Sequence, residues 1–167
     1  MAQIAPLVGT GINRSTGKVL AGWSHVMQSL GVIFSTSFGE RVMRRHFGSF
    51  VPVVLGEKLV PSTLLKFWTA ICVAIEIWEP RYKVTRIVPA ASPEQMRQGI
   101  LGYRIEGVYR PRGHLGDFTP EARAGRFFTI GGRPDEGVRV LPDDGNAGVA
   151  DFRNPANSGL LAAIEDL

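Results

Sequence analysis

The strongest constraint on how this chain folds is an apolar segment that stops abruptly at a glutamate, a proline and an arginine. Between Pro61 and Trp78 apolar residues recur at steps of three and four, which predicts a helix with a core-facing stripe of Leu64, Trp68, Ile71, Ile75 and Trp78. Three further apolar side chains widen this stripe, namely Leu65, Phe67 and Cys72. Because the segment carries only two charged residues, we expect the helix to be buried on most of its sides.

Pro80 determines how this helix ends. Proline has no N–H to donate, and it disfavours helical geometry at the preceding residue, Glu79. The chain is therefore expected to turn at this corner and continue as a strand over residues 81–88. In extended geometry the side chains of Glu79 and Arg81 point to the same side. Two interpretations are open: a surface ion pair worth at most about 1 kcal/mol, or a rigid element that presents paired charges to a partner.

The segments after the corner predict a small sheet. Ser92-Pro93-Glu94-Gln95 is typical of a capped helix start, so a short helix is expected between two strands. Apolar residues alternate with others over the second strand, residues 101–110, which indicates that one face is buried. Two further short strands are expected at 127–130 and 138–141, and a last short helix at 160–167.

The first part of the chain predicts a second main helix. Ser24 is a suitable N-cap for a helix that extends to Phe34 with Val26, Leu30 and Ile33 on one face. A short strand is expected at 18–23 and a helical turn at 40–46. The predicted fold is one α+β domain, in which two main helices pack on a small mixed or antiparallel sheet with a projecting β-hairpin and extended terminal arms.

Three regions are expected along the chain. Residues 1–17 are rich in Gly, Ser, Thr and Asn and predict an N-terminal arm. Residues 18–110 form the predicted core domain. Residues 111–167, in which Gly, Pro, Asp and Arg are frequent, form a C-terminal extension of unassigned role.

Composition argues against several classes of protein. The chain has 167 residues and a net charge of +4, and its basic residues are spread out, so nucleic-acid binding is not indicated. No apolar run approaches the roughly 20 residues that span a bilayer. The single cysteine, Cys72, excludes an internal disulfide, and the three histidines lack ligand spacing, so neither a metal nor a cofactor is expected. The N-terminus does not have the pattern of a signal peptide, and a cytoplasm-like compartment is expected.

A peptidoglycan hydrolase is a possibility that the carboxylates keep open. Such an enzyme needs two carboxylates on either side of a sugar, one of them kept protonated by an apolar pocket. Glu40, Glu76 and Glu79 are the candidates. Most glutamates of this kind are solvated or ion-paired, so no catalytic residue is assigned.

Five short motifs follow one another over residues 10–90: a glycine-flanked arm (Gly11 to Gly17), His25-x-x-Gln28-Ser29, Gly39-Glu40-Arg41, Phe47-Gly48-Ser49 and Trp78-Glu79-Pro80-Arg81. Each motif is weak by itself, but their ordered combination resembles the baseplate wedge and sheath-initiator family of contractile phage tails. That family also includes a baseplate subunit of type VI secretion systems. The resemblance covers about half of the chain, and residues 111–167 extend beyond it.

The resemblance implies a structural protein rather than an enzyme, although many members of the family carry a lysozyme label. It implies a place in the virion tail baseplate, assembled in the host cytoplasm, with six copies around the tail tube. The implied partners are the wedge core proteins and the tail sheath protein, with tail tube proteins as a further class. The resemblance is also compatible with a type VI secretion subunit and with a soluble regulatory binder of this fold.

The resemblance also implies two partner-binding regions. The Glu79-Pro80-Arg81 corner would dock on the wedge core. The hairpin that follows would start the sheath by pairing with a strand of a sheath subunit, because an open strand edge invites pairing. The residues expected there are Val84, Arg86, Leu101, Tyr103, Ile105 and Val108.

Overall fold

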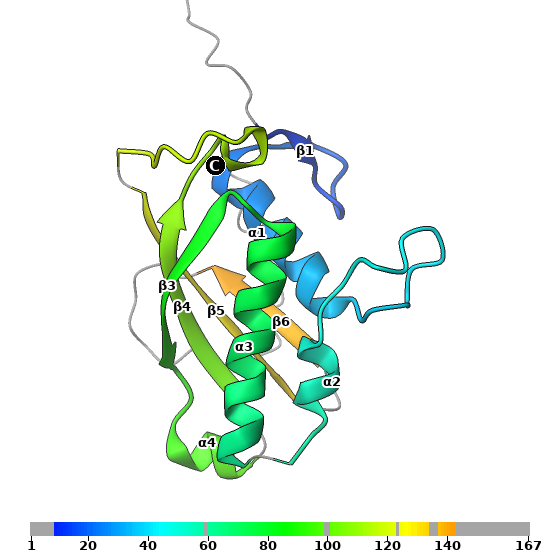
Figure 1. Ribbon diagram of the computed structural model, residues 1–167, viewed down its shortest axis with the longest axis vertical. Coiled ribbons are helices and arrows are strands. Elements are labelled where there is room, and N and C mark those ends of the chain that lie inside the picture. The colour runs from blue at the N-terminus through cyan, green and yellow to red at the C-terminus, as the bar shows by residue number, and fades with distance from the viewer. Residues whose placement is uncertain (1–8, 59, 99–100, 123, 134–136, 143–167) are drawn as a thin grey trace, which may run out of the picture.

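A computed structural model describes residues 9–58, 60–98, 101–122, 124–133 and 137–142. Within these residues the chain forms an antiparallel four-stranded sheet, a small two-stranded sheet and four α-helices (Figure 1). The predicted α+β class is confirmed. The expected helix at 160–167 and parts of both expected terminal arms lie outside the described residues.

Helix α1 spans Gly22–Ser35, and its N-cap is Ala21 rather than the predicted Ser24. Its stripe of Val26, Leu30 and Ile33 is fully buried, as the periodicity predicts. Before it, strands β1 (Gly11–Ile12) and β2 (Val19–Leu20) form a short antiparallel hairpin. Residues 40–46 are not helical; they belong to the loop between α1 and a short helix α2, Val51–Leu55.

Helix α3 spans Pro61–Trp78, with both ends as predicted. Its buried face is rotated from the predicted stripe and consists of Thr63, Phe67, Ile71, Ala74 and Ile75. Trp68 and Trp78 are half-buried at the border of this face. The opposite face exposes Leu65, Val73 and Ile77, so the expectation of burial on most sides is wrong. The reason is position: α3 packs against one face of the sheet and its outer side meets solvent.

Strands β3 (Tyr82–Pro89), β4 (Leu101–Tyr109), β5 (Gly125–Arg133) and β6 (Gly137–Pro142) pair in that order. The hairpin predicted to project is therefore part of a larger sheet, since β5 pairs along nearly the whole of β4. A two-stranded ribbon is marginal alone, and the strands predicted at 127–130 and 138–141 complete it. The division at residue 110 stays a prediction as a domain boundary, although β4 and β5 share one core.

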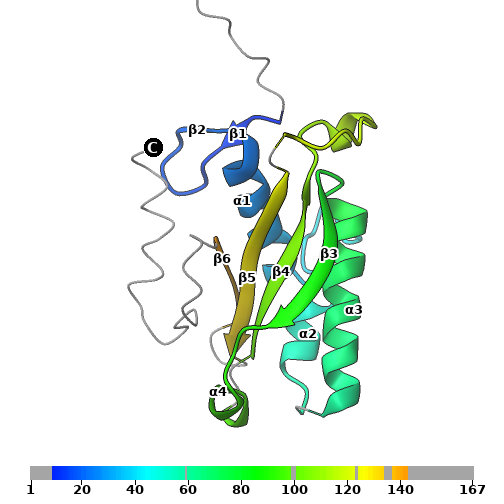
Figure 2. The ribbon, with the colours of Figure 1, turned by 90° about the vertical axis from the view of Figure 1, so that its left-hand side faces the viewer.

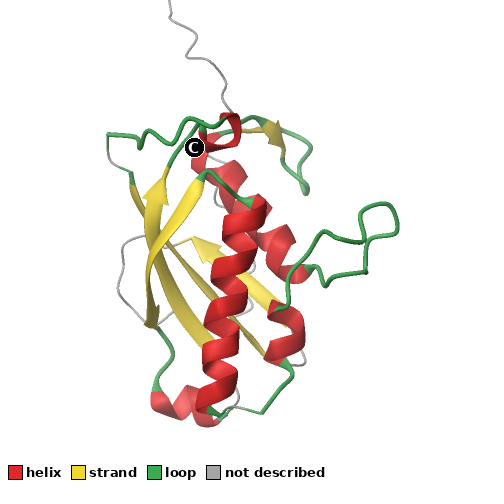
Figure 3. Ribbon diagram, in the orientation of Figure 1, coloured by secondary structure: helices red, strands yellow, loops and turns green. Residues whose placement is uncertain are grey.

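Helices α1, α2 and α3 cover one face of the sheet, with α1 and α2 near β6 and α3 near β3 (Figures 1 and 2). The core between the layers contains Tyr103, Ile105, Phe128 and Ile130 from the two central strands. Helix α4 (Pro93–Arg97) lies at one end of the sheet, in the β3–β4 connection (Figure 3). Its predicted capping box is present, because Ser92 Oγ accepts from Gln95 N and Gln95 Oε1 accepts from Ser92 N.

Candidate functional site: a pocket over a buried ion pair

The corner after α3 forms as the sequence predicts. The N–H of Glu79 still donates to the Ile75 carbonyl, at 2.8 Å, and is the last bond of the helix. Pro80 then prevents a further turn, and the N–H of Tyr82 donates to the Glu79 carbonyl at 3.0 Å. This tight turn places Glu79 and Arg81 side by side at the start of β3.

The Glu79 and Arg81 side chains form a buried, two-pronged ion pair. Arg81 Nε lies 2.6 Å from Glu79 Oε1, and Arg81 Nη2 lies 2.8 Å from Oε2. The arginine side chain is only 8% exposed and the glutamate side chain only 2%. The interpretation as a surface ion pair is therefore wrong. Neither charge protrudes from the fold, and a role of the corner in docking stays a prediction. The turn directs both side chains inward, and the Arg81 guanidinium lies close to Gly9, just before β1.

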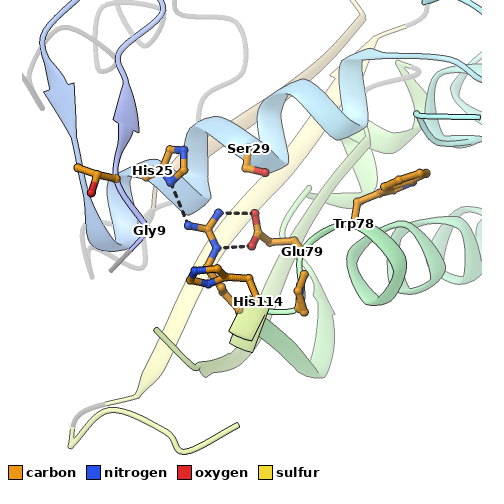
Figure 4. Close-up of a pocket in the computed structure, with 9 residues that line it drawn as sticks. Gly9, His25, Ser29, Trp78, Glu79 and His114 are labelled. Atoms are coloured by element: carbon orange, nitrogen blue, oxygen red, sulfur yellow. Dashed lines mark hydrogen bonds and ion pairs between the residues drawn. The ribbon is translucent and has the colours of Figure 1, made fainter. Parts of the chain in front are cut away.

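His25 is the third member of this cluster. Arg81 Nη1 lies 2.9 Å from His25 Nδ1, 56 residues away in the sequence. Burial lowers the pKa of His25 from its ordinary value of 6.5, and the neighbouring Arg81 guanidinium lowers it further. A neutral imidazole fits this geometry, since Nδ1 then accepts the proton that Arg81 donates and the ring also bonds to the Gly9 backbone. Figure 4 shows the chain of contacts from His25 through the guanidinium to Glu79.

The β1–β2 hairpin closes over the same cluster. A side chain on Gly11 would meet the His25 ring, so only glycine permits this close approach. One turn along α1 from His25, Gln28 holds the hairpin through two bonds: its Oε1 accepts from Arg14 N, and its Nε2 donates to the Ile12 carbonyl, each at 2.9 Å. The spacing of three places both side chains on one face of α1, which explains the His-x-x-Gln motif.

The corner after α3 and the neighbouring part of α1 line an open pocket of about 520 Å³ (Figure 4). The ion pair lies at its floor, and its walls include Gly9, His25, Ser29, Trp78, Pro80 and His114. A pocket of this size accepts a side chain or a short segment of a partner. The sequence identified Glu79, Pro80 and Arg81 but gave His25 no role at the corner and did not include Gly9 or His114. The His25-x-x-Gln28-Ser29 motif was a local signal for this part of the pocket.

The residues predicted for strand addition separate into two groups. Leu101, Tyr103 and Ile105 are buried beneath the helices, and their strand β4 is paired on both sides. Val108 also has a partner on each side, Lys83 and Gly125. Strand addition at β4 is therefore excluded, because its backbone groups are already bonded within the sheet.

Val84 and Arg86 lie on β3, which is an edge of the four-stranded sheet. Arg110 N donates to the Arg81 carbonyl, and the alternation of an antiparallel ladder then directs the N–H of Val84 away from β4. A bulge follows at once, between Val84 and Arg86. It leaves Thr85 without an opposite residue and strengthens the local twist of the edge.

The three carboxylates considered for a hydrolase are each engaged. Both oxygens of Glu76 accept from Lys83 Nζ, at 2.8 and 2.9 Å. Glu40 Oε2 accepts from the Ser37 N–H at 2.8 Å, and Glu79 is held by Arg81. An acid catalyst of this class needs a carboxyl in apolar surroundings, whereas both oxygens of Glu79 bond to the Arg81 guanidinium.

Comparison with known proteins identifies the family. Residues 21–113, more than half of the chain, match the family of baseplate wedge protein gp25. The chain belongs to this baseplate wedge family. Baseplate protein W of Escherichia phage P2 is 35% identical over 82 residues, which are 49% of this chain and 71% of that protein. The wedge family match includes α1, α3 and the whole corner pocket except Gly9, Thr10 and His114.

One of two similar solved structures supports the wedge fold. A chain in the cryo-EM structure of the postcontracted pyocin R2 baseplate is 24% identical with a TM-score of 0.52, covering 60% of this chain and 98% of that one. A putative tail lysozyme from Geobacter sulfurreducens is 24% identical with a TM-score of 0.49, covering 67% and 93%. The first shows a shared fold; the second is too distant for its label to bear on activity.

The chain is thus a structural protein of the baseplate wedge of a contractile phage tail. The resemblance noted in the sequence is confirmed. Across the residues that the structure describes, no helix combines the length and apolar character needed to cross a membrane.

Proposed function

We propose that this wedge protein docks on the core of the wedge through the pocket at the Glu79-Pro80-Arg81 corner and starts the sheath at the edge of β3. The observation that carries the first part is the pocket itself. An open, mixed polar and apolar hollow lies over a buried ion pair, and its lining includes Gly9 and Thr10, just before β1, and His25 and Ser29 on α1. The partner enters the pocket; the corner does not enter the partner.

The ion pair has a clear role in this proposal. A buried ion pair is no more stabilising than an apolar replacement of similar volume, so its presence favours a role in shape or recognition. Three of the N–H groups of Arg81 already bond to Glu79 and His25. The guanidinium is therefore held rigid at the pocket floor, where it favours an acceptor on the entering segment.

The second part of the proposal concerns β3. The edge strand offers outward backbone groups at Val84, and Thr85 and Arg86 beside it are exposed. A strand from a sheath subunit adding here would extend the sheet from four strands to five by backbone hydrogen bonds. The bulge between Val84 and Arg86 interrupts the regular edge, so an added strand cannot slide freely along β3. This suits an initiator that must bind one partner and not aggregate.

We further propose that the wedge protein acts in six copies around the tail tube and has no catalytic role. The engaged state of Glu40, Glu76 and Glu79 supports a structural role over a hydrolase. A turbidity assay on peptidoglycan tests that choice: the purified protein should leave turbidity unchanged, and clearance that is lost in a Glu76→Gln variant would overturn it.

Filling the pocket tests the docking site without touching the ion pair. Ser29→Trp places a large ring in the pocket, whereas Ser35→Trp, at the exposed end of the same helix, adds the same ring elsewhere. Co-purification with the wedge core proteins of the same virus should be lost with Ser29→Trp and kept with Ser35→Trp, at equal melting temperatures. Equal recovery of both variants would show that the core does not enter this pocket.

A further inference from the structure

The loop between α1 and α2 projects from the body of the protein (Figures 1 and 3). It carries exposed apolar and basic side chains. Val42 and Met43 are 80% and 93% exposed. Arg41, Arg44 and Arg45 surround them and are exposed as well. We call residues 38–48 the arginine loop. Neither the pocket nor the β3 edge includes it, so the proposed function leaves it unexplained.

The base of the arginine loop is held by backbone contacts. Ser37 and Ser49 form a parallel bridge, and Ser49 N donates to the Thr36 carbonyl at 2.9 Å. Gly48 has a φ of +138°, and a side chain there would collide with the backbone of Thr36 and Ser37. The two ends of the loop are therefore bonded to each other where they leave the body of the protein.

The middle of the loop is also fixed. Gly39 N donates to the Arg45 carbonyl at 2.8 Å, which closes the tip. The guanidinium carbons of Arg41 and Arg44 lie 4.5 and 5.9 Å from the centre of the Phe47 ring. Phe47 in turn packs on Trp78, with ring centres 5.0 Å apart, and Trp78 Nε1 donates to the Gly48 carbonyl at 2.9 Å. The tip is thus held in one shape by its own aromatic base.

Pre-organisation of this kind matters for binding. A loop that is already ordered loses little conformational entropy when a partner binds. Arginine and methionine are enriched at protein interfaces, and buried arginine anchors are frequent hot spots. An exposed methionine at the apex of a fixed loop has no stabilising role in the free protein, because its apolar surface stays in water.

The charges identify the chemistry of the partner. Three arginines face one glutamate, Glu40, whose carboxylate bonds to the Ser37 N–H. Within the part of the chain that the structure describes, no carboxylate pairs with Arg41, Arg44 or Arg45. Guanidinium groups match carboxylates with two parallel bonds, which favours an acidic surface. The chain itself has a net charge of +4, so a second copy is a poor match.

We infer that the arginine loop is a second docking element, which inserts Val42 and Met43 into an apolar pocket rimmed by carboxylates on another baseplate protein. A bilayer is less suited, because membrane-bound elements present a broad apolar face and this tip has two apolar side chains. The inference is independent of the pocket and of β3. Trp78 connects the arginine loop with the corner pocket, since its ring packs on Phe47 and also lines the pocket.

Binding of tip variants to the wedge subcomplex of the same virus, purified without this chain, tests the inference. Met43→Ser with Arg45→Glu removes the apex and reverses a charge without touching the Phe47 stack. Leu65→Ser with Arg97→Glu makes comparable changes on exposed positions of α3 and α4, although Arg97, unlike Arg45, is paired with a carboxylate, that of Glu94. The tip variant should bind about tenfold or more weakly, the scale of an interface hot spot, and the control should bind as the wild type does.

A photo-crosslinker in place of Met43 identifies the occupant in assembled baseplates. Crosslinks to an acidic segment of another baseplate protein support the inference. Crosslinks to a second copy of this chain, or tip-dependent binding to vesicles of anionic lipid, would overturn it. Wild-type affinity of the tip variant in the binding assay would overturn it as well, whatever Ser29→Trp does at the corner pocket.

Discussion

Arg81 and Glu79, two residues apart across a proline, meet in a two-pronged ion pair at 2.6 and 2.8 Å that is almost wholly removed from solvent. Removing one partner of a buried pair leaves the other charge without compensation. Arg81→Ala should therefore lower the free energy of unfolding by about 3–5 kcal/mol. Urea unfolding of the purified protein measures this change.

A matched control and a rescue sharpen that test. Lys66→Ala breaks an exposed pair with Glu57 and should change stability by at most about 1 kcal/mol. Glu79→Leu with Arg81→Met removes both charges and should recover much of the lost stability. A stable Arg81→Ala protein would show that solvent reaches Glu79 and that the pair is effectively exposed.

Helix α3 offers a direct test of which face is buried. Phe67 is 1% exposed and Leu65, two positions earlier, is 62% exposed. Phe67→Ala should destabilise the protein by about 3–5 kcal/mol, because it leaves a cavity in the core. Leu65→Ala should have an effect near zero, and similar effects from the two variants would contradict the orientation of α3.

Proline substitutions distinguish the edge strand from the central one. Val108 lies in β4 between two paired strands, so Val108→Pro removes a ladder donor from the sheet interior and should destabilise the fold itself. Val84→Pro acts at the edge, where the N–H points outward, and should leave the fold intact. If β3 receives the sheath strand, Val84→Pro abolishes sheath polymerisation on isolated baseplates, and full-length sheath on that variant would end the strand-addition proposal.

Stability should depend on pH through His25. Its pKa is lowered in the folded protein, first by burial and then by Arg81, below the value of 6.5 that it has when unfolded. The unfolded chain therefore binds more protons at low pH, and this contribution to stability is complete above that value and is lost as the pH falls through the folded pKa. The Glu79 carboxylate raises the pKa of His25 and so partly offsets this lowering, whereas the nearby His114 lowers the pKa further.

Urea unfolding at about pH 7.5 and about pH 5 measures this contribution. The wild type should lose more stability between the two than His25→Gln does, since glutamine does not titrate. His46→Gln, at an exposed position, should follow the wild type. An equal loss in the wild type and His25→Gln would mean that another group carries the pH dependence.

Much of the fold follows from rules that act over a few residues. The proline at 61 and the Glu79-Pro80 pair mark both ends of α3, because proline suits the first turn of a helix and disfavours helix before it. The Ser92–Gln95 capping box and the alternation in β4 are local for the same reason. These elements form where the sequence predicts them.

The sequence could not decide which face of α3 is buried. Apolar side chains occur on several sides of this helix, so more than one stripe of apolar residues has the helical period. The sequence also could not place β4 at the centre of the sheet, since that depends on β5 pairing across a connection of fifteen residues, 110–124. The corner pocket depends still more on the tertiary structure. Packing of α1 and the β1–β2 hairpin brings His25 to Arg81. The Glu79–Arg81 ion pair would be weak in water, and burial strengthens it at the base of the pocket. The local sequence determined the turn at Glu79-Pro80-Arg81, and only the packing of the tertiary structure decided that its two charged side chains face inward.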